Sequence, residues 1–199
     1  MPKRDPDPLL LRSNGKSTAS VPLPRISGAP LAVPHGRKVH DALQIRIDRD
    51  GIWYYRGSPI ERKEMVCLLA SALRRDDDGG YWLVTPTEMG RIDVEDAPFL
   101  AVEMYLGGVG HDRFVSVRTN VDEIVTIDAA HPLYVVIDGD TGEPRPYVKL
   151  DLGREARINR AVYYELAALA EEAVVDGTQQ VGVWSGGAFF SLGPAGNAG

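Results

Sequence analysis

Residues 50–60 constrain this chain most, because they join a turn, a strand and the start of a helix within a few positions. Asp50-Gly51 is a dipeptide preferred in type I′ hairpin turns, in which both central residues need positive φ. The next four residues, 52–55, are Ile-Trp-Tyr-Tyr and fit the pleated surface of a half-buried strand. Gly57 then interrupts the strand. The stretch predicts a β-hairpin whose second strand leads directly into a helix.

The helix is predicted from capping residues and from apolar spacing. Ser58 and Glu61 form the S-x-x-E pattern of a capping box, and Pro59 suits a first helical turn. Apolar residues then recur at helical spacing, namely Met65, Leu68, Leu69, Ala72 and Leu73. This spacing predicts an amphipathic helix with one buried stripe.

The same order of elements is predicted twice along the chain. Strands are expected near residues 43–48, 52–55, 81–84 and 91–94, and again near 99–106, 113–118, 124–127, 133–137 and 147–150. A second helix is expected over residues 154–173, followed by a last hairpin of residues 181–184 and 188–192. We therefore predict an α+β fold of two similar β-β-α-β-β units, residues 39–98 and 99–193, the second including a linking hairpin.

The two ends of the chain differ in composition from the predicted α+β body. Residues 1–38 hold seven of the 14 prolines and no aromatic residue, which predicts a flexible, Pro-rich arm. Residues 1–40 carry seven Lys/Arg and two Asp, a balance of +5, so the net charge of −6 leaves −11 on residues 41–199. An acidic body repels phosphate backbones, which argues against non-specific nucleic-acid binding. Residues 194–199 are expected to be a frayed tail.

Composition narrows the class of protein. At 199 residues, with 44% hydrophobic and 25% charged residues, the chain is typical of globular proteins. No apolar run approaches the ~20 residues of a membrane span, and the N-terminus lacks the apolar core of a secretory signal. Cys67 is the single cysteine, which excludes a disulfide framework. We expect a cytoplasmic protein without a membrane partner.

The common catalytic and cofactor motifs are absent from the sequence. It has no G-x-S-x-G, H-E-x-x-H, Walker A or dinucleotide-binding pattern. Asp138-x-Asp140 resembles the start of a calcium loop, but Gly142 and Glu143 stand where an oxygen ligand and a glycine belong. The four histidines have no metal-ligand spacing. The sequence therefore predicts no metal site and no cofactor.

An acidic cluster is the first candidate site. Glu88, Glu95 and Asp96 lie around predicted strand ends, next to prolines. Glu95 or Asp96 could act as a general base if its carboxylate lay in a crevice. Asp96 is explained equally well as a turn-forming residue that accepts hydrogen bonds from its own backbone.

A basic and aromatic cluster is the second candidate site. Its members are Arg118, Asn120, Tyr147, Arg157, Arg160 and Tyr164. Arg157, Arg160 and Tyr164 are spaced to share one face of the predicted second helix, opposite its apolar stripe. Of the 22 basic residues 17 are Arg, whose planar guanidinium fits carboxylate and phosphate groups. The alternative is that these arginines pair with the acidic body of the same chain.

Several short blocks of the sequence resemble a known family. They include Asp50-Gly51-x-Trp53-x-Tyr55-x-Gly57-Ser58-Pro59-Ile60, Leu83-Val84-Thr85-Pro86-x-Glu88, Val94-Glu95-Asp96-Ala97-Pro98-Phe99, Arg118-Thr119-Asn120, His131-Pro132-Leu133, Arg145-Pro146-Tyr147, Arg160-x-Val162-Tyr163-Tyr164 and Gly182-Val183-Trp184-Ser185-Gly186-Gly187-x-Phe189-Phe190. In this order they resemble the bacterial domain-of-unknown-function family 1285 (DUF1285). Met89 and Gly90 stand where the family is expected to have bulkier or basic residues. The resemblance implies two similar α+β units, no established reaction, and a suggested role in signalling or ligand sensing.

Three functional hypotheses follow from the sequence. The first is a non-enzymatic ligand-binding or regulatory protein that holds a small anionic molecule or peptide at the seam between the two units. Glu88, Glu95 and Asp96 would then orient the arginines or bind polar groups of the ligand. The second is a hydrolase-like enzyme with Glu95 or Asp96 as general base. The third is a structural adaptor that pairs through a sheet edge or the basic arm, and homo-oligomerisation is compatible with all three.

Overall fold

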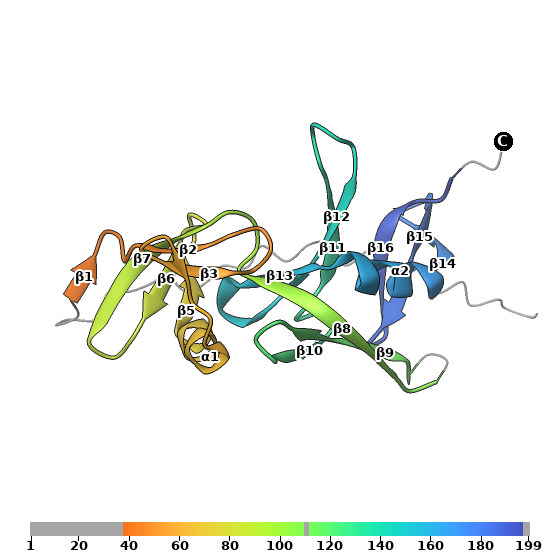
Figure 1. Cartoon of the computed structure of the whole chain (residues 1–199). Helices are drawn as coiled ribbons and strands as arrows, with labels where there is room; N and C mark the ends of the chain where they lie inside the picture. Colours follow the sequence, from red (N-terminus) through yellow and green to blue (C-terminus); the bar gives the residue numbers. More distant parts are fainter. Residues whose placement is uncertain (1–37, 110–111, 197–199) are drawn as a thin grey trace, which may run out of the picture.

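The computed structural model describes residues 38–109 and 112–196. They form sixteen strands, two α-helices and a short 3-10 helix, in agreement with the predicted α+β class (Figure 1). The predicted arm, apart from Lys38, and residues 197–199 of the predicted tail lie outside the described residues. Within the described ranges, every helix is too short or too polar to cross a membrane.

The first half forms one mixed sheet with a helix beside it. Its elements are β1 (Lys38–His40), β2 (Ile45–Ile47), β3 (Trp53–Tyr55), β4 (Ser58–Pro59), α1 (Lys63–Ser71), β5 (Leu73–Arg75), β6 (Tyr81–Val84) and β7 (Glu88–Val94). The strand order is β4-β3-β2-β7-β6-β5, in which β2 and β7 are parallel and all other neighbours antiparallel. Strand β1 pairs in parallel with the beginning of β7.

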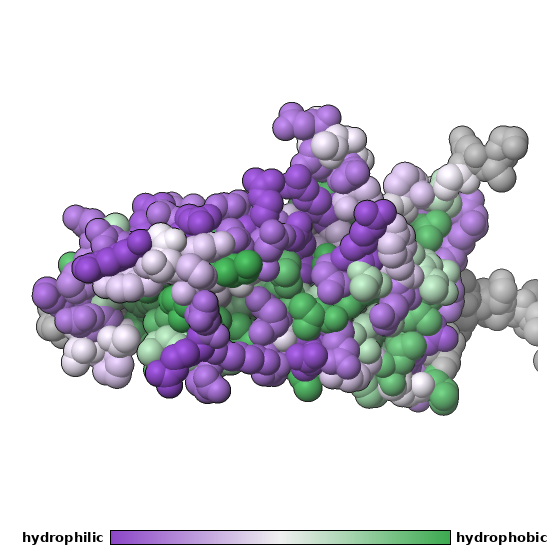
Figure 2. All heavy atoms as spheres, in the orientation of Figure 1, coloured by the Kyte–Doolittle hydropathy of each residue, from purple (hydrophilic) through white to green (hydrophobic). Residues whose placement is uncertain are grey.

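The second half contains two sheets. The larger has β8 (Phe99–Gly107), β9 (Phe114–Thr119), β10 (Ile124–Thr126), β11 (Leu133–Ile137), β12 (Pro144–Lys149) and β13 (Glu155–Ile158), in the order β10-β9-β8-β13-β12-β11. Helix α2 (Arg160–Ala168) follows, and then the antiparallel sheet of β14 (Glu171–Val175), β15 (Thr178–Ser185) and β16 (Ala188–Pro194). The β11–β12 hairpin protrudes from the body, and its tip is hydrophilic (Figures 1 and 2).

The two six-stranded paths share one order of pairing. Each consists of two three-stranded antiparallel meanders, joined in parallel through the first and last strands, β2 with β7 and β8 with β13. The helices break this similarity, because α1 connects the two meanders of the first half whereas α2 follows both meanders of the second. The pairing order is therefore repeated, but the repeated β-β-α-β-β unit expected from the sequence is not confirmed.

The turn predicted at Asp50-Gly51 has a different type. Gly51 has φ +74°, but Asp50 is not among the residues with positive φ. The Asp48 carboxylate accepts the backbone N–H groups of Asp50 and Ile52, at 2.9 Å each, and so stabilises a longer connection. The type I′ dihedrals occur instead at Arg56-Gly57, with φ of 50° and 83°.

The predicted capping box does not form, because its residues belong to a strand. Ser58 and Pro59 pair with Tyr55 and Tyr54 as β4, so α1 begins only at Lys63 and has no side-chain cap. Its buried stripe is also narrower than predicted. Met65 and Leu68 remain 43% and 66% exposed, respectively.

The second helix is shorter than predicted at both ends. Residues 155–158 form β13, which pairs with β8 and β12, and Asn159 caps α2 by accepting the Val162 N–H at 2.8 Å. Strand pairing on both sides stabilises this segment more than helix formation would. Arg157 is therefore on a strand, whereas Arg160 and Tyr164 lie one turn apart on α2.

One hydrophobic core runs through both halves. It includes Trp53 of the first half and Phe99, Val115 and Leu166 of the second, all at most 1% exposed. Burial of such side chains contributes about 1.5–3 kcal/mol each relative to exposure. Because the core is continuous, the polar groups at the seam between the halves lie on a closely packed layer of apolar side chains.

Candidate functional site at the seam between the halves

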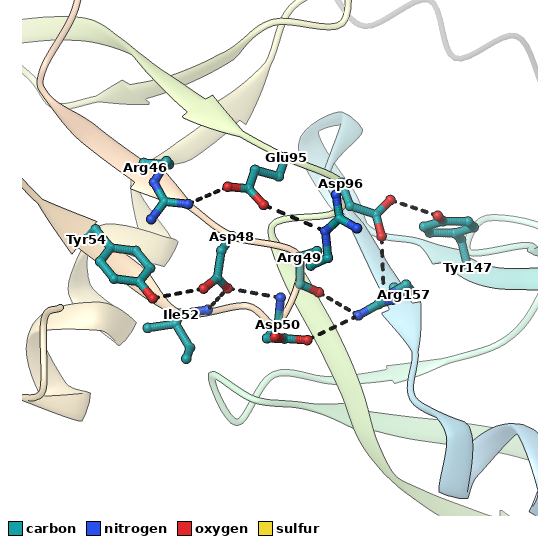
Figure 3. Close-up of polar contacts among 10 residues, drawn as sticks. All are labelled: Arg46, Asp48, Arg49, Asp50, Ile52, Tyr54, Glu95, Asp96, Tyr147 and Arg157. Carbon is teal, nitrogen blue, oxygen red and sulfur yellow. Dashed lines mark hydrogen bonds and ion pairs between the residues drawn. The ribbon is translucent and has the colours of Figure 1, made fainter. Parts of the chain in front are cut away.

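The seam is formed by the loop after β2, the linker Glu95-Asp96, and strands β12 and β13 (Figure 3). Asp48 organises the loop, because it also accepts the Tyr54 hydroxyl at 3.0 Å. Slight burial raises the pKa of Asp48, but the hydrogen bonds from Ile52, Tyr54 and Asp50 outweigh it and lower the pKa below its usual value. The loop therefore presents a fixed backbone to the second half.

Asp96 connects the linker to both strands of the second half. Its Oδ1 accepts the Tyr147 hydroxyl at 2.7 Å, and its Oδ2 lies 3.4 Å from Arg157 Nε. That Nε is buried and makes no well-aligned hydrogen bond, so the contact is an ion pair rather than a directional bond. The pKa of Tyr147 is raised to about 12. Burial is the largest cause, and the hydrogen bond to Asp96 is the second.

Arg157 also contacts the loop of the first half. Its Nη2 donates to the Arg49 carbonyl oxygen and lies 4.0 Å from the Asp50 carboxylate (Figure 3). A single guanidinium thus joins the loop, the linker and β13. Since Arg157 and Tyr147 are opposite each other in the β12–β13 register, one pair of strands positions both groups.

Glu95 is bound within the first half. One carboxylate oxygen pairs with Arg46, and the other lies 3.8 Å from Arg49 Nε. Arg46 in turn lies over the Tyr54 ring at 4.3 Å. Both oxygens of Glu95, like both of Asp96, therefore face cations or donors of the same chain.

Asn120 bridges the halves by its side-chain amide. Its Nδ2 donates to the Gly51 carbonyl at 3.2 Å, and its Oδ1 accepts the Leu100 N–H at 3.1 Å. Both polar ends are therefore used for internal hydrogen bonds. We conclude that Asn120 positions the loop against β8.

An open groove of about 400 Å³ lies next to the seam, between β12, β13 and the start of α2. Its lining residues are Glu143, Pro144, Arg145, Pro146, Arg157, Ile158, Arg160, Tyr163 and Tyr164. Three arginines and two tyrosines thus surround one cavity. Three of the residues predicted from the sequence, Arg157, Arg160 and Tyr164, meet here.

The three arginines differ in how they are paired. Arg145 pairs with Asp138 and Arg157 with Asp96. Arg160 donates from Nε and Nη2 to the Tyr164 hydroxyl, at 3.0 and 2.9 Å. Among the described residues no carboxylate lies within 4.0 Å of Arg160. Glu143 attracts Arg160 only from a longer distance, so the charge of Arg160 is compensated less directly than those of Arg145 and Arg157.

Two predicted residues lie away from the seam and the groove. Arg118 pairs with Glu103 at 2.7 Å and with Asp122 at 2.8 Å. Glu88 is at the start of β7, beside His40. Sequence spacing could not place either residue, because it carries no information on how the sheets are arranged.

Two groove residues, Arg145 and Tyr163, were not among the predicted site residues. Arg145 is two positions from Tyr147 on β12, so strand alternation places both on one face. Tyr163 precedes Tyr164 and tilts toward it, with ring centroids 6.3 Å apart. The alternation of side chains along β12 is therefore the sequence pattern that could have identified Arg145 as a site residue.

Two further ion pairs lie next to β13, one between the halves and one within the second half. Arg75 of β5 pairs with Glu155 of β13 at 2.9 Å. Arg154, 7% exposed, binds Glu123 through two hydrogen bonds of 3.0 and 2.9 Å. Burial raises the pKa of nearby Tyr81 and Tyr134, so these phenols stay neutral.

These features define an α+β protein whose halves share one strand-pairing order and meet at a charged seam. Family comparisons match the DUF1285 N-terminal domain, described as a domain of unknown function, to residues 35–97. They match the C-terminal domain, described as a protein of unknown function, to residues 98–192. The chain therefore belongs to the DUF1285 family, as its sequence blocks predicted.

Solved structures of this family resemble the chain. A DUF1285 family protein from Silicibacter pomeroyi DSS-3 is 36% identical, with a TM-score of 0.74 over 84% of this chain and 90% of that one. A DUF1285 family protein from Shewanella baltica OS155 is 29% identical, with a TM-score of 0.48 over 61% of this chain and 87% of that one. A search of curated proteins finds no match.

Proposed function

We propose that this chain is a non-enzymatic regulatory protein that binds a small anionic molecule in the groove beside the seam. The observation that carries the proposal is that Arg145, Arg157 and Arg160 line one cavity of about 400 Å³. Guanidinium groups bind carboxylates and phosphates through paired, charge-assisted hydrogen bonds. The ligand would contact Arg160 first, because that arginine has the least internal compensation.

Most of the other groove residues fit such a ligand, and Glu143 is the one carboxylate in the lining. Tyr163, Tyr164, Pro144 and Pro146 provide apolar and aromatic walls. The groove also adjoins the first turn of α2, where the helix dipole favours negative charge. A ligand with an anionic group and a small organic body would use both kinds of surface.

Thermal unfolding of the protein with inorganic phosphate, nucleotides and small carboxylic acids tests the proposal. A ligand at a hundred times its dissociation constant adds about 2.7 kcal/mol to the free energy of unfolding. The response should be strongly reduced in Arg160→Ala. Arg91→Ala removes an exposed arginine from β7 of the first half and should leave the response unchanged.

Two outcomes would count against the proposal. One is that no anion in the panel changes the unfolding temperature. The other is that Arg160→Ala and Arg91→Ala weaken binding equally, since that would indicate attraction by net charge alone. Titration calorimetry with the responding anion then gives the affinity in each variant.

The other hypotheses have less support. A general base at Glu95 or Asp96 requires a carboxylate that faces substrate, whereas both face internal partners. An adaptor would need a partner at its strand edges or its basic arm, and deletion of residues 1–38 followed by a measurement of self-association tests it. A cytoplasmic location remains part of the proposal and is tested by cell fractionation.

A further inference from the structure

A second, mostly apolar pocket lies in the first half and shares no residue with the arginine groove. It has a volume of about 260 Å³. Its lining residues are His40, Leu43, Ile45, Tyr55, Leu69, Ala72, Leu83, Thr85, Glu88, Met89 and Gly90. The aliphatic walls come from β2, β6, β7 and the end of α1, so the pocket lies between the sheet and the helix.

Close packing shapes the pocket floor at Gly90. A Cβ atom at this position would lie 2.4 Å from Leu43 Cγ, so Gly90 leaves room for the Leu43 side chain where it lies. Met89 and Leu83, at 3% and 5% exposure, are fixed in the core behind it. The floor of the cavity thus consists of closely packed apolar side chains.

The pocket has one carboxylate, Glu88, in its lining. The turn before it is held by three hydrogen bonds: the Thr85 N–H and hydroxyl donate to the Glu88 carbonyl at 2.8 and 2.9 Å, and the Glu88 N–H donates to the Thr85 hydroxyl at 3.0 Å. The nearest basic side chain among the described residues is His40, whose Nε2 is 3.8 Å from the carboxylate, beyond hydrogen-bond distance. Lys38 is opposite Glu88 in the β1–β7 register, but its ammonium group is not within 4.0 Å of the carboxylate. Glu88 therefore keeps its acceptor capacity.

We propose that this pocket binds an amphipathic amine, that is, a small molecule with an aliphatic body and a primary ammonium group. The body would replace water against the aliphatic walls, and the ammonium group would pair with Glu88. Tyr55, 46% exposed, lies at the rim, where the Arg56 guanidinium is 5.2 Å from its ring centroid, so the ammonium group would depend on Glu88. An anionic ligand would be repelled by Glu88, which separates this site from the arginine groove.

The test compares three probes of equal chain length on the full chain: octylammonium, 1-octanol and octanoate. Octylammonium should bind about fivefold more tightly than 1-octanol, and octanoate most weakly, since a partly exposed ion pair contributes up to ~1 kcal/mol. Glu88→Gln should abolish the preference for the amine. Glu61→Gln, which removes an exposed carboxylate elsewhere, should keep the preference.

Methyl NMR of the wild-type chain locates the probe without a variant. The methyl groups of Leu43, Ile45 and Met89 should shift on addition of octylammonium, and Arg160→Ala should leave these shifts unchanged. Equal affinity for octylammonium and octanoate, an unchanged preference in Glu88→Gln, or shifts confined to other residues would each overturn the proposal. Because the two sites share no residue, failure here leaves the anion groove unaffected.

Discussion

The side-chain amide of Asn120 lies directly over Gly51, and its Nδ2 donates to the Gly51 carbonyl at 3.2 Å. This contact ties the first hairpin loop to the second half. It needs a residue without a side chain, because a Cβ on Gly51 would lie 2.7 Å from Asn120 Nδ2. Gly51 is thus required both by its φ of +74° and by the closeness of the other half.

Gly51→Ala should therefore cost more stability than an alanine at an open turn. We expect about 2–3 kcal/mol, which combines a left-handed backbone penalty with the loss of a hydrogen bond. Gly177→Ala is the matched control, since Gly177 has φ +77° and a Cβ there would meet no atom within 4 Å, and should cost about 1 kcal/mol. Urea unfolding measures both values, and equal losses would show that the Asn120 contact is unimportant.

Asp96→Asn should change stability and anion binding in opposite directions. The variant keeps the shape but removes the charge that compensates Arg157, so we expect a loss of about 1–3 kcal/mol. Anion affinity in the groove should rise severalfold, because Arg157 then has an uncompensated charge. Chemical unfolding and calorimetry with the responding anion test both parts.

A decrease in affinity together with the loss of a hydrolytic activity would instead favour the general-base hypothesis. Tyr147→Phe provides the control, because it removes the other hydrogen bond to Asp96 and keeps the ion pair with Arg157. It should lower stability by about 1 kcal/mol and leave the anion affinity unchanged.

Stability should fall at high pH through the seam tyrosines. The pKa of Tyr147 is raised to about 12 in the folded state, against about 10 in the unfolded chain. Between these values the folded state binds more protons, so stability is fully present below pH ~10 and is lost as the pH rises toward 12. Unfolding free energies from pH 8 to 12 should show a smaller decrease in Tyr147→Phe, and an identical decrease would refute the assignment.

The sequence was most informative where a pattern depends on neighbouring residues alone. The strands around Ile45, Tyr81 and Val183 were placed correctly because alternation and β-branched residues act locally. The helix start at Ser58 was wrong because pairing with Tyr55 across a two-residue turn outweighed the capping pattern. Tertiary pairing competes with local propensity, and the sequence alone does not show its outcome.

The sequence predicted some residues of the groove and missed others. The sequence spacing grouped Arg157 with Arg160, and the groove contains both residues, although Arg157 is on β13 and not on the helix. That this groove binds an anion stays a prediction. Arg118 was misplaced because its partners, Glu103 and Asp122, are on the neighbouring strand and in the turn after β9. Residues that meet only through sheet order, such as Arg154 and Glu123, gave no sequence signal.

The ion pairs Arg154–Glu123 and Arg118–Glu103 allow a buried charge to be compared with an exposed one. Glu123→Gln leaves the buried Arg154 guanidinium without its counterion, and we expect a loss of about 3 kcal/mol in the free energy of unfolding. Glu103→Gln removes one of the two partners of Arg118, which is 30% exposed and keeps Asp122, so the loss should be much smaller. Denaturant titrations of both variants, at low and at high salt, measure the difference. Since screening acts mainly on exposed charges, only the Glu103 effect should shrink with salt, and a parallel decrease for Glu123 would mean that solvent reaches Arg154.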